Sequence, residues 1–532
     1  MSSELHDILA ALEGDMSPDA GAQFVAVATR YFSGTRDGAG PVSTALSQGE
    51  LAARFEEPIP ERGRELDEVV RRLERDVLGD SNRLYHPMYM GHQVSAPLPA
   101  AVWAESVTAA LNQSLPVGEM SPAGTALEHR VIRWMTTLVG WGERSGGTLT
   151  SGGTEATFAA LLAARSVAIP DVWRRGVGAN PPVVLCGEHA HYAVSRAVGE
   201  MGLGLDALEL VPSRDPSLRS GQRYAMDVGA LRERLDALDA AGRRVLAVVA
   251  TAGSTATGSF DDLETIGALC DERGLWLHVD AAHGGSALLS PTHRSRLAGI
   301  ERARSIAWDP HKMMLLPLSA GMVLVREERD LEGAFAQRAP YLFHGDGEER
   351  VLDQGIRSFQ CSRRADVLKL WVALQRYGAA GIGALHDHLC ETALALHEEI
   401  GRRDDFVALH APQSNILCFR YVGESEESDE RLDAVNRELR ERYNRSGQGW
   451  ITATNLAGRR VLRVTIMNPR TTRDHVRALL DGLAAEGRAL LAERADGSIR
   501  PRTGGAATTS SASASSAPAT APGVPPAGSA RS

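Results

Sequence analysis

Short apolar runs alternate with helical segments between about residues 83 and 380. The clearest runs are rich in valine, leucine and alanine, and they lie at 182–186, 244–250 and 275–279. Runs of this length between helical segments are typical of buried parallel strands. The pattern predicts a large α/β domain over residues 83–380, built on a doubly wound, mainly parallel sheet.

The two ends of the chain have different patterns. Residues 1–82 are charged and of helical character, which predicts a helical arm. The segment 381–495 reads as a small α+β domain, with a helix and two strand-like runs at 385–401, 415–421 and 461–466. The last segment, 496–532, is dominated by alanine, serine, threonine, proline and glycine. Because such a segment cannot bury enough apolar surface to fold, we expect a disordered tail.

Two polar motifs suggest what the sheet carries. The motif Trp308–Lys312 follows His278–Gly285 by about thirty residues, a spacing that fits one strand-loop-strand step of an α/β sheet. Lys312 offers an amine that can form a Schiff base with an aldehyde, and Asp280 offers a carboxylate that can keep a pyridine nitrogen protonated. Together they predict a pyridoxal phosphate site. Either residue alone is also typical of an ordinary surface lysine or a strand-capping aspartate.

A phosphate cradle is expected at the turn Ser151–Thr154, which precedes a helical run at 158–166. Gly153 lets the backbone approach an anion, the following helix directs free N–H groups at it, and Thr154 adds a hydroxyl. An ordinary strand-to-helix turn is the alternative reading.

The remaining ring contacts are expected after two other strands. His191 follows the run 182–186 and is our candidate for stacking on the ring and for proton transfer, with His189 as its competitor. Ser254 lies in the polar loop 251–261, at the carboxyl end of a buried strand, where open sheets bind ligands. Its hydroxyl could contact the ring or phosphate, or it could satisfy the local backbone.

These motifs, in this order, resemble the group II pyridoxal phosphate-dependent amino acid decarboxylases. The resemblance begins at His86–His92 and Met120–Glu128 and ends near Leu462–Pro469. It implies a fold type I enzyme of the aspartate aminotransferase kind, and a homodimer in which the arm contacts the second subunit.

The resemblance also assigns roles by position. Lys312 would hold the cofactor and Asp280 would face its ring nitrogen, while Ala282 would pack under the ring and His191 above it. Gly153, Thr154 and Ser254 would lie on the phosphate or ring side, and His311 would support the cofactor. Asp309 departs from the asparagine of several relatives, so we leave it out of the phosphate contacts.

Tyr341 lies in a segment, Asp330–Leu342, that resembles the family's mobile catalytic loop. A tyrosine at this position implies protonation of Cα after carbon dioxide leaves, whereas phenylalanine is typical of relatives that form aldehydes. On the residues alone, a tyrosine after a proline is more often a packing residue. A transaminase, an aldehyde synthase and a non-catalytic cofactor-binding protein are the alternatives.

The substrate is the least determined part. His86 and His92 are candidate substrate contacts, although Gly91–Gln93 differs from the substrate-reading segments of glutamate and aromatic decarboxylases. The segments Leu111–Ser114 and Met467–Thr472 are most similar to bacterial diaminobutyrate and aspartate decarboxylases. We therefore expect a polar or charged amino acid, with an aromatic amino acid or glutamate as alternatives.

Composition narrows the partners. The chain has 57 basic and 67 acidic residues, a formal charge of −10, so a nucleic-acid surface is not expected. Five scattered cysteines without Cys-x-x-Cys spacing predict neither disulfides nor a metal site. Because neither a secretory signal nor a membrane-length apolar run is found, we expect a soluble, cytoplasmic protein.

Overall fold

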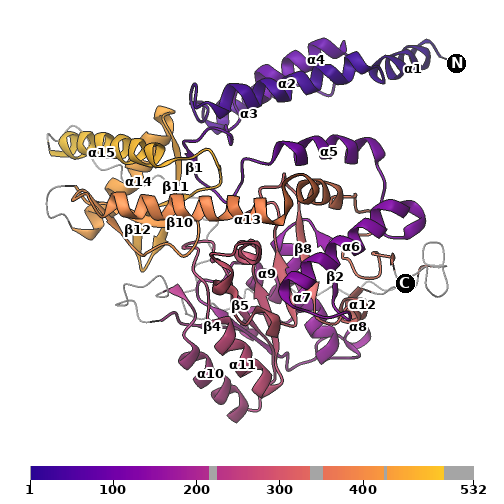
Figure 1. The fold of residues 1–532 in the computed structure, drawn as a ribbon, viewed down its shortest axis with the longest axis vertical. Helices are drawn as coiled ribbons and strands as arrows, with labels where there is room; N and C mark the ends of the chain where they lie inside the picture. Colours follow the sequence, from indigo (N-terminus) through magenta and orange to yellow (C-terminus); the bar gives the residue numbers. More distant parts are fainter. Residues whose placement is uncertain (1, 215–223, 336–338, 340–351, 424–427, 496–532) are drawn as a thin grey trace, which may run out of the picture.

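The computed structural model describes residues 2–214, 224–335, 339, 352–423 and 428–495. Its larger sheet has seven strands in the order β2-β8-β7-β6-β5-β3-β4. In that order the strands are Gly146–Thr150, Gly321–Val325, Ser305–Trp308, Trp276–Asp280, Val245–Thr251, Val183–Gly187 and Leu208–Val211. Only β8 runs antiparallel to its neighbours. The prediction of a mainly parallel sheet is confirmed (Figure 1).

Successive residues of the strands pack into two separate cores, one on each face of this sheet. On one face, Val184, Ala247 and Val323 pack with α7 (Gly153–Ala168), α9 (Ala193–Glu200) and α12 (Arg329–Phe335). On the other, Leu185 and Val248 pack with α6 (Pro122–Val139), α10 (Val228–Ala240), α11 (Leu263–Arg273) and α13 (Val367–Ile400). A strand buried on both faces requires apolar residues at every position, which explains the continuous apolar runs of the sequence. The sheet is doubly wound, as predicted.

The second sheet has the order β1-β11-β12-β10-β9. Its strands are Tyr89–Met90, Trp450–Leu456, Arg459–Thr465, Ile416–Tyr421 and Phe406–Ala408. The helices α14 (Asp429–Ser446) and α15 (Arg473–Ala495) pack with it. This is the α+β arrangement expected of the C-terminal part.

The chain crosses between the two sheets in two places. Residues 89–90 form β1 and pair with β11, although they lie within the range predicted for the larger domain. The helix α13 runs through residue 380, the predicted boundary, and it is kinked at Gly378, where φ is +69°. The long helix therefore connects the larger sheet to the second sheet.

The amino-terminal segment folds into helices, and α1 projects beyond the two sheets (Figure 1). Its helices are α1 (Ser3–Asp15), α2 (Pro18–Arg36), α3 (Gln48–Arg54) and α4 (Leu66–Arg72), continued by the π-helical η1 (Leu73–Leu78). The remaining helices are α5 (Pro99–Leu111), α8 (Val172–Arg175) and the short 3-10 turns η2 (Gly118–Met120), η3 (Leu205–Ala207), η5 (Gly284–Leu289), η6 (Arg294–Leu297) and η7 (Ile300–Arg302). Among the described residues, no helix is both long and apolar enough to cross a membrane.

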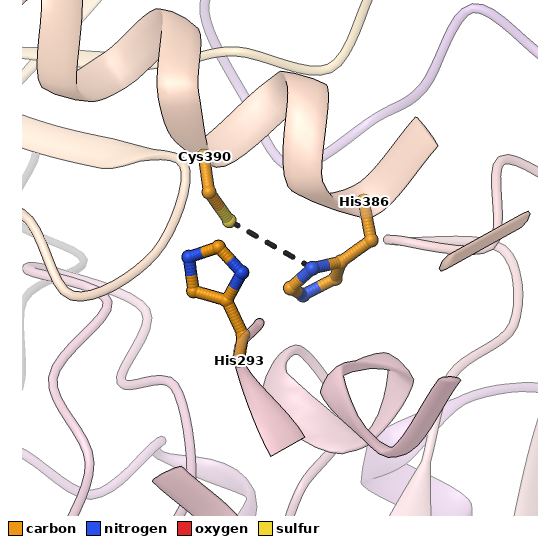
Figure 2. A group of neighbouring side chains, drawn as sticks. All are labelled: His293, His386 and Cys390. Carbon is orange, nitrogen blue, oxygen red and sulfur yellow. Dashed lines mark hydrogen bonds between the residues drawn. The ribbon is translucent and has the colours of Figure 1, made fainter. Parts of the chain in front are cut away.

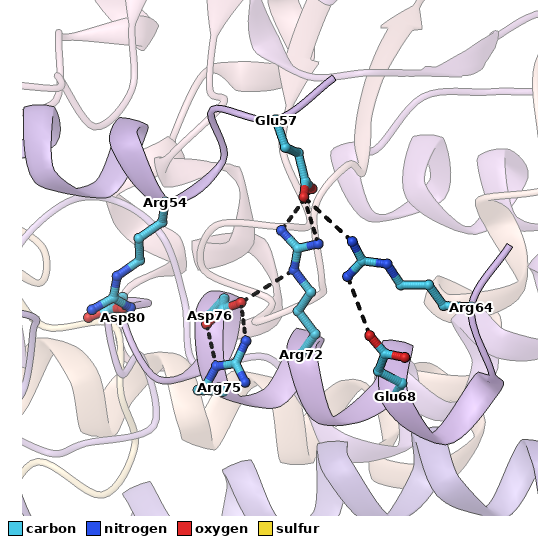
Figure 3. A network of polar contacts seen from close by, with 8 residues as sticks. All are labelled: Arg54, Glu57, Arg64, Glu68, Arg72, Arg75, Asp76 and Asp80. Atoms are coloured by element: carbon cyan, nitrogen blue, oxygen red, sulfur yellow. Dashed lines mark hydrogen bonds and ion pairs between the residues drawn. The ribbon is translucent and has the colours of Figure 1, made fainter. Parts of the chain in front are cut away.

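Ion pairs hold the loop between α3 and α4 against α4 (Figure 3). Glu57 accepts two hydrogen bonds from Arg72, at 3.0 and 2.7 Å, and lies 3.7 Å from Arg64. Arg64 also pairs with Glu68 at 3.6 Å. These charges are in contact with solvent, so they orient the loop more than they stabilise the fold.

Candidate active site

The polar motifs of the sequence meet at the carboxyl edge of the larger sheet. There β6 ends at Asp280 and β7 ends at Trp308, four residues before Lys312. A cavity of about 320 Å³ lies at this edge. Its walls include most of the residues that the sequence analysis proposed: Gly153, Thr154, His191, Asp280, Ala282, His311 and Lys312.

Lys312 is held by a buried carboxylate. Its Nζ lies 3.0 Å from Oδ2 of Asp309, a side chain that is only 2% exposed. The His311 Nε2 lies 3.6 Å from the same oxygen, and His311 Nδ1 accepts a hydrogen bond from the Ala320 N–H at 3.1 Å. Burial lowers the pKa of His311, so its ring is neutral. The contacts with Asp309 and Ala320 fix the orientation of the ring. Asp309, which we had left out of the phosphate contacts, is therefore the partner of the lysine.

Asp280 is positioned by the loop that it begins. Its Oδ1 accepts a hydrogen bond from the Ala282 N–H at 3.2 Å. The Ala282 carbonyl in turn accepts from the Asp309 N–H at 3.1 Å. Since the two loops are joined in this way, Asp280 and Lys312 have fixed positions on the same cavity.

The glycine turn before α7 packs closely against these loops. A Cβ at Gly153 would lie 2.8 Å from the Ala282 Cβ and 3.0 Å from Asp309 Oδ2. A larger residue at position 153 would push into the side chains of the cavity wall. Because Gly153 has no side chain, the turn leaves room for a ligand. The first N–H groups of α7 have no hydrogen-bond partner within the helix, and they point out of its amino end, which lies at the cavity. An anionic group fits here.

The structure distinguishes the two histidines after β3. His191 lines the cavity, and its Nδ1 accepts from the Ala193 N–H at 3.2 Å. Burial lowers the pKa of His191, with Asp280 acting in the opposite direction. His189 instead faces the Tyr224 ring, at 5.4 Å between centroids, and lines a separate, smaller cavity. His191 is the better placed candidate.

Three other proposed residues do not reach the cavity. The Ser254 hydroxyl is buried and bonds to Thr257 Oγ1 at 2.8 Å and Ser259 Oγ at 3.0 Å, so it satisfies its own loop. The His86 Nδ1 accepts from the Met88 N–H at 3.1 Å. His92 packs against the Trp450 ring, at 5.2 Å between centroids. The geometry of one chain does not bring these side chains to Lys312, and Tyr341 lies outside the described residues.

Three residues that line the cavity each carry a buried atom that has no hydrogen-bond partner among the described residues. The atoms are Oδ1 of Asp309, Nδ1 of His283 and Oγ1 of Thr251. His283 Nε2 bonds to Asn415 Oδ1 at 2.7 Å, and burial lowers the His283 pKa to about 3. Buried polar groups are costly unless they are paired, so the wall is suited to a polar ligand such as pyridoxal phosphate. His283 lies in the motif His278–Gly285 but was given no role from the sequence, and its place beside Ala282 was the available signal.

Comparison with known proteins agrees with this geometry. The model of the pyridoxal-dependent decarboxylase conserved domain matches residues 49–422. An L-2,4-diaminobutyrate decarboxylase of Rhizobium meliloti (strain 1021) is 34% identical over 438 residues, covering 82% of this chain and 84% of the relative. The cysteine sulfinic acid decarboxylase of Rattus norvegicus is 33% identical over 408 residues, covering 75% and 81%.

A solved structure gives the same result for the fold. The crystal structure of mouse CSAD in apo form superposes with a TM-score of 0.80 at 29% identity, over 88% of this chain and 99% of that one. The family model matches well over half of the chain, and the fold and the cofactor predicted from the sequence are both confirmed. The chain belongs to the pyridoxal-dependent decarboxylase family and is a pyridoxal phosphate-dependent amino acid decarboxylase.

Proposed function

We propose that amino acid decarboxylation takes place in the Lys312 cavity, with a polar or charged amino acid as substrate. The observation that carries this proposal is that Lys312, Asp280 and the amino end of α7 line one cavity of about 320 Å³. Lys312 would hold the cofactor aldehyde, Asp280 would bind the ring nitrogen, and Gly153 and Thr154 would bind the phosphate. Bound pyridoxal phosphate supplies an electron sink for the electron pair that remains at Cα when carbon dioxide leaves.

The residues around the cavity supply the rest of the chemistry. Asp309 Oδ2, 3.0 Å from Lys312 Nζ, would orient the lysine side chain in the cavity. Ala282 supports one face of the ring site and His191 the other. Since burial lowers the His191 pKa, this imidazole is neutral at physiological pH and can accept and return a proton. We propose Tyr341 as the group that protonates Cα, which would separate this chain from aldehyde-forming relatives.

The substrate class rests on the relatives and on one buried cation. Among the relatives are a diaminobutyrate decarboxylase, a cysteine sulfinic acid decarboxylase and an acidic amino acid decarboxylase of Mus musculus, the last at 30% identity. Arg463 is 6% exposed, and its Nη2 has no hydrogen-bond partner among the described residues. Its Nε donates to the Ala256 carbonyl at 3.2 Å, next to Thr255 on the cavity wall. We propose that a substrate carboxylate pairs with Arg463, and we expect Arg463→Gln to raise KM more than it lowers kcat.

We also propose a homodimer. The α1 helix and its C-cap residue Met16 expose apolar side chains at helical spacing. They are Leu5, Ile8, Leu9, Leu12 and Met16, each between 43% and 73% exposed. A stripe of this kind on a projecting arm is typical of a protein interface. Light scattering of active protein should give twice the chain mass, and a monomer with full activity would refute the proposal.

The five cysteines are all free, which supports our proposal of a reducing, cytoplasmic setting.

The direct test of the roles is Lys312→Ala. The variant should lose the visible absorbance of covalently held cofactor and should release no carbon dioxide. Thr255→Ala, on the same wall but outside the proposed roles, is the matched control and should keep the absorbance. If Lys312→Ala retains both the absorbance and turnover, the lysine does not hold the cofactor.

A further inference from the structure

A cluster of side chains of the metal-ligating kinds is formed by His293, His386 and Cys390, none of which lines the Lys312 cavity. Figure 2 shows the three side chains. His293, in the segment between η5 and η6, converges on His386 and Cys390 of α13. One potential ligand atom from each residue lies within 4.8 Å of the others. His386 and Cys390 are one helical turn apart, so their side chains share a face of the helix.

The distances within the cluster suit a small cation. Cys390 Sγ lies 3.9 Å from His386 Nδ1. Ligand atoms around a tetrahedral Zn²⁺ ion, with bonds of about 2.0–2.3 Å, lie about 3.3–3.8 Å from one another. The side chains therefore need to move inward by only a few tenths of an ångström to about 1 Å.

A carboxylate completes the group. Asp387 Oδ1 lies 2.9 Å from His293 Nδ1 and 3.6 Å from His386 Nδ1. Asp387 also accepts hydrogen bonds from the hydroxyls of Ser290 and Thr292, which fix its orientation. The oriented carboxylate thus lies beside the two imidazoles, next to the group of His293, His386 and Cys390.

The position of the cluster argues against a set of surface groups that meet by chance. His386 is 3% exposed and Cys390 is 5% exposed, and the His293 side chain is 15% exposed. The backbone around it is close-packed, since a Cβ at Gly383 of α13 would lie 2.1 Å from the Leu289 carbonyl oxygen. Four polar side chains share a site where an ordinary core would be aliphatic.

We propose that His293, His386, Cys390 and Asp387 form a structural zinc site. Nitrogen and sulfur donors with one carboxylate favour Zn²⁺ over the harder Mg²⁺ and Ca²⁺. On binding, the thiol proton leaves to solvent and the thiolate takes its place as a ligand. The cysteine spacing predicted no metal site. The proposed ligands do not appear in that spacing because they come from segments almost one hundred residues apart, one with His293 and the other with Cys390.

The site would connect two parts of the active-site framework. The segment that carries His293 follows β6, which ends at Asp280, and the loop that contains His283. After α13 the chain enters the second sheet. Bound zinc would therefore fix the exit of the cofactor-binding strand to the helix that joins the sheets. We expect it to raise the thermal midpoint of the holoenzyme without entering the chemistry.

The test uses untagged holoenzyme, treated with chelator and then titrated with Co²⁺ and with Zn²⁺. Wild type should bind one ion per chain, with the visible bands of tetrahedral Co²⁺ and a thiolate charge-transfer band in the difference spectrum. Cys390→Ser should lose the thiolate band and His293→Ala should weaken binding at least tenfold. Cys270→Ser removes a buried free thiol of α11 and is the matched control, so it should bind as wild type does.

Absence of binding by wild type, or equal binding by wild type, Cys390→Ser and His293→Ala, would overturn the proposal. The absorbance of bound cofactor reports folding in each variant. If Cys390→Ser does not fold, the half-buried His293→Ala variant still decides between the two outcomes.

Discussion

Replacement of Glu128 tests whether its buried ion pair stabilises β2 and the glycine turn that follows this strand. Glu128 of α6 is fully buried and accepts two hydrogen bonds from Arg363, at 2.8 and 2.7 Å. It also accepts the Leu149 N–H at 3.1 Å and the Thr148 hydroxyl at 3.2 Å in β2, the strand that leads into the turn. The variant Glu128→Gln keeps the shape of the side chain and leaves the Arg363 charge buried without a counter-ion.

The loss of free energy of unfolding should be about 3–5 kcal/mol, as is typical when one partner of a buried ion pair is removed. The double variant Glu128→Leu/Arg363→Met replaces both charges by apolar side chains and should recover part of this loss, because the Leu149 N–H and the Thr148 hydroxyl still lose their acceptor. Arg144→Ala removes an exposed pair with Glu327 at 3.0 Å and should cost less than about 1 kcal/mol.

Thermal unfolding of the three variants and wild type, followed by tryptophan fluorescence with cofactor bound, gives the comparison. Retained cofactor absorbance in Glu128→Gln before the transition would show that the site forms in the variant. A midpoint for Glu128→Gln that falls no further than that of Arg144→Ala would refute the reasoning, and so would a double variant that is less stable than Glu128→Gln.

Three further predictions concern the glycine turn, Tyr341 and the pH dependence of stability. Gly153→Ala should weaken cofactor affinity at least tenfold in an apoenzyme titration, because the new Cβ would lie 2.8 Å from Ala282 Cβ and 3.0 Å from Asp309; unchanged affinity would remove the turn from the site. Tyr341→Phe should divert product from amine towards aldehyde and peroxide with cofactor binding intact, and unchanged amine yield by mass spectrometry would return Tyr341 to a packing role. Burial lowers the His278 pKa to about 4. Because the unfolded chain, with a pKa of about 6.5, binds more protons, His278 should cost up to about 1.4 kcal/mol of stability per pH unit as pH falls from 6.5 to 4. His278→Leu should flatten this dependence in urea titrations at pH 7.5 and 5, and equal slopes would contradict the assignment.

The sequence was sufficient for the parallel strands and for the central motif. The predicted runs 182–186, 244–250 and 275–279 each begin one residue before the observed β3, β5 and β6. Parallel strands end at the same edge, so motifs that follow different strands meet there without any knowledge of distance. This is why Lys312 and Asp280 could be paired from the sequence.

Side-chain direction could not be obtained in the same way. Ser254 lies in the expected loop, but its hydroxyl turns back to Thr257 and Ser259. Asp309 was left out of the phosphate contacts on charge, and the sequence does not show that its carboxylate lies 3.0 Å from Lys312 Nζ. The same limit hid the cluster of His293, His386 and Cys390, which only the packing of α13 on the η5–η6 segment brings together.

The antiparallel strand β8 and the crossing of β1 into the second sheet were also not predicted. β8, at Gly321–Val325, is a short apolar run that resembles its parallel neighbours, so its direction depends on pairing with β2 and β7. β1 has only two residues, Tyr89 and Met90, and a strand of that length leaves no periodic signal.

Product analysis tests the central claim most directly. Purified protein with pyridoxal phosphate is incubated separately with diaminobutyrate, aspartate, glutamate, cysteine sulfinate, tyrosine and tryptophan, and carbon dioxide and organic products are measured by mass spectrometry. The account predicts carbon dioxide with an equal amount of amine from one of the polar or charged substrates, and neither product from the Lys312→Ala variant. A keto acid or an aldehyde as the main product, or amine formed only from tyrosine or tryptophan, would contradict it.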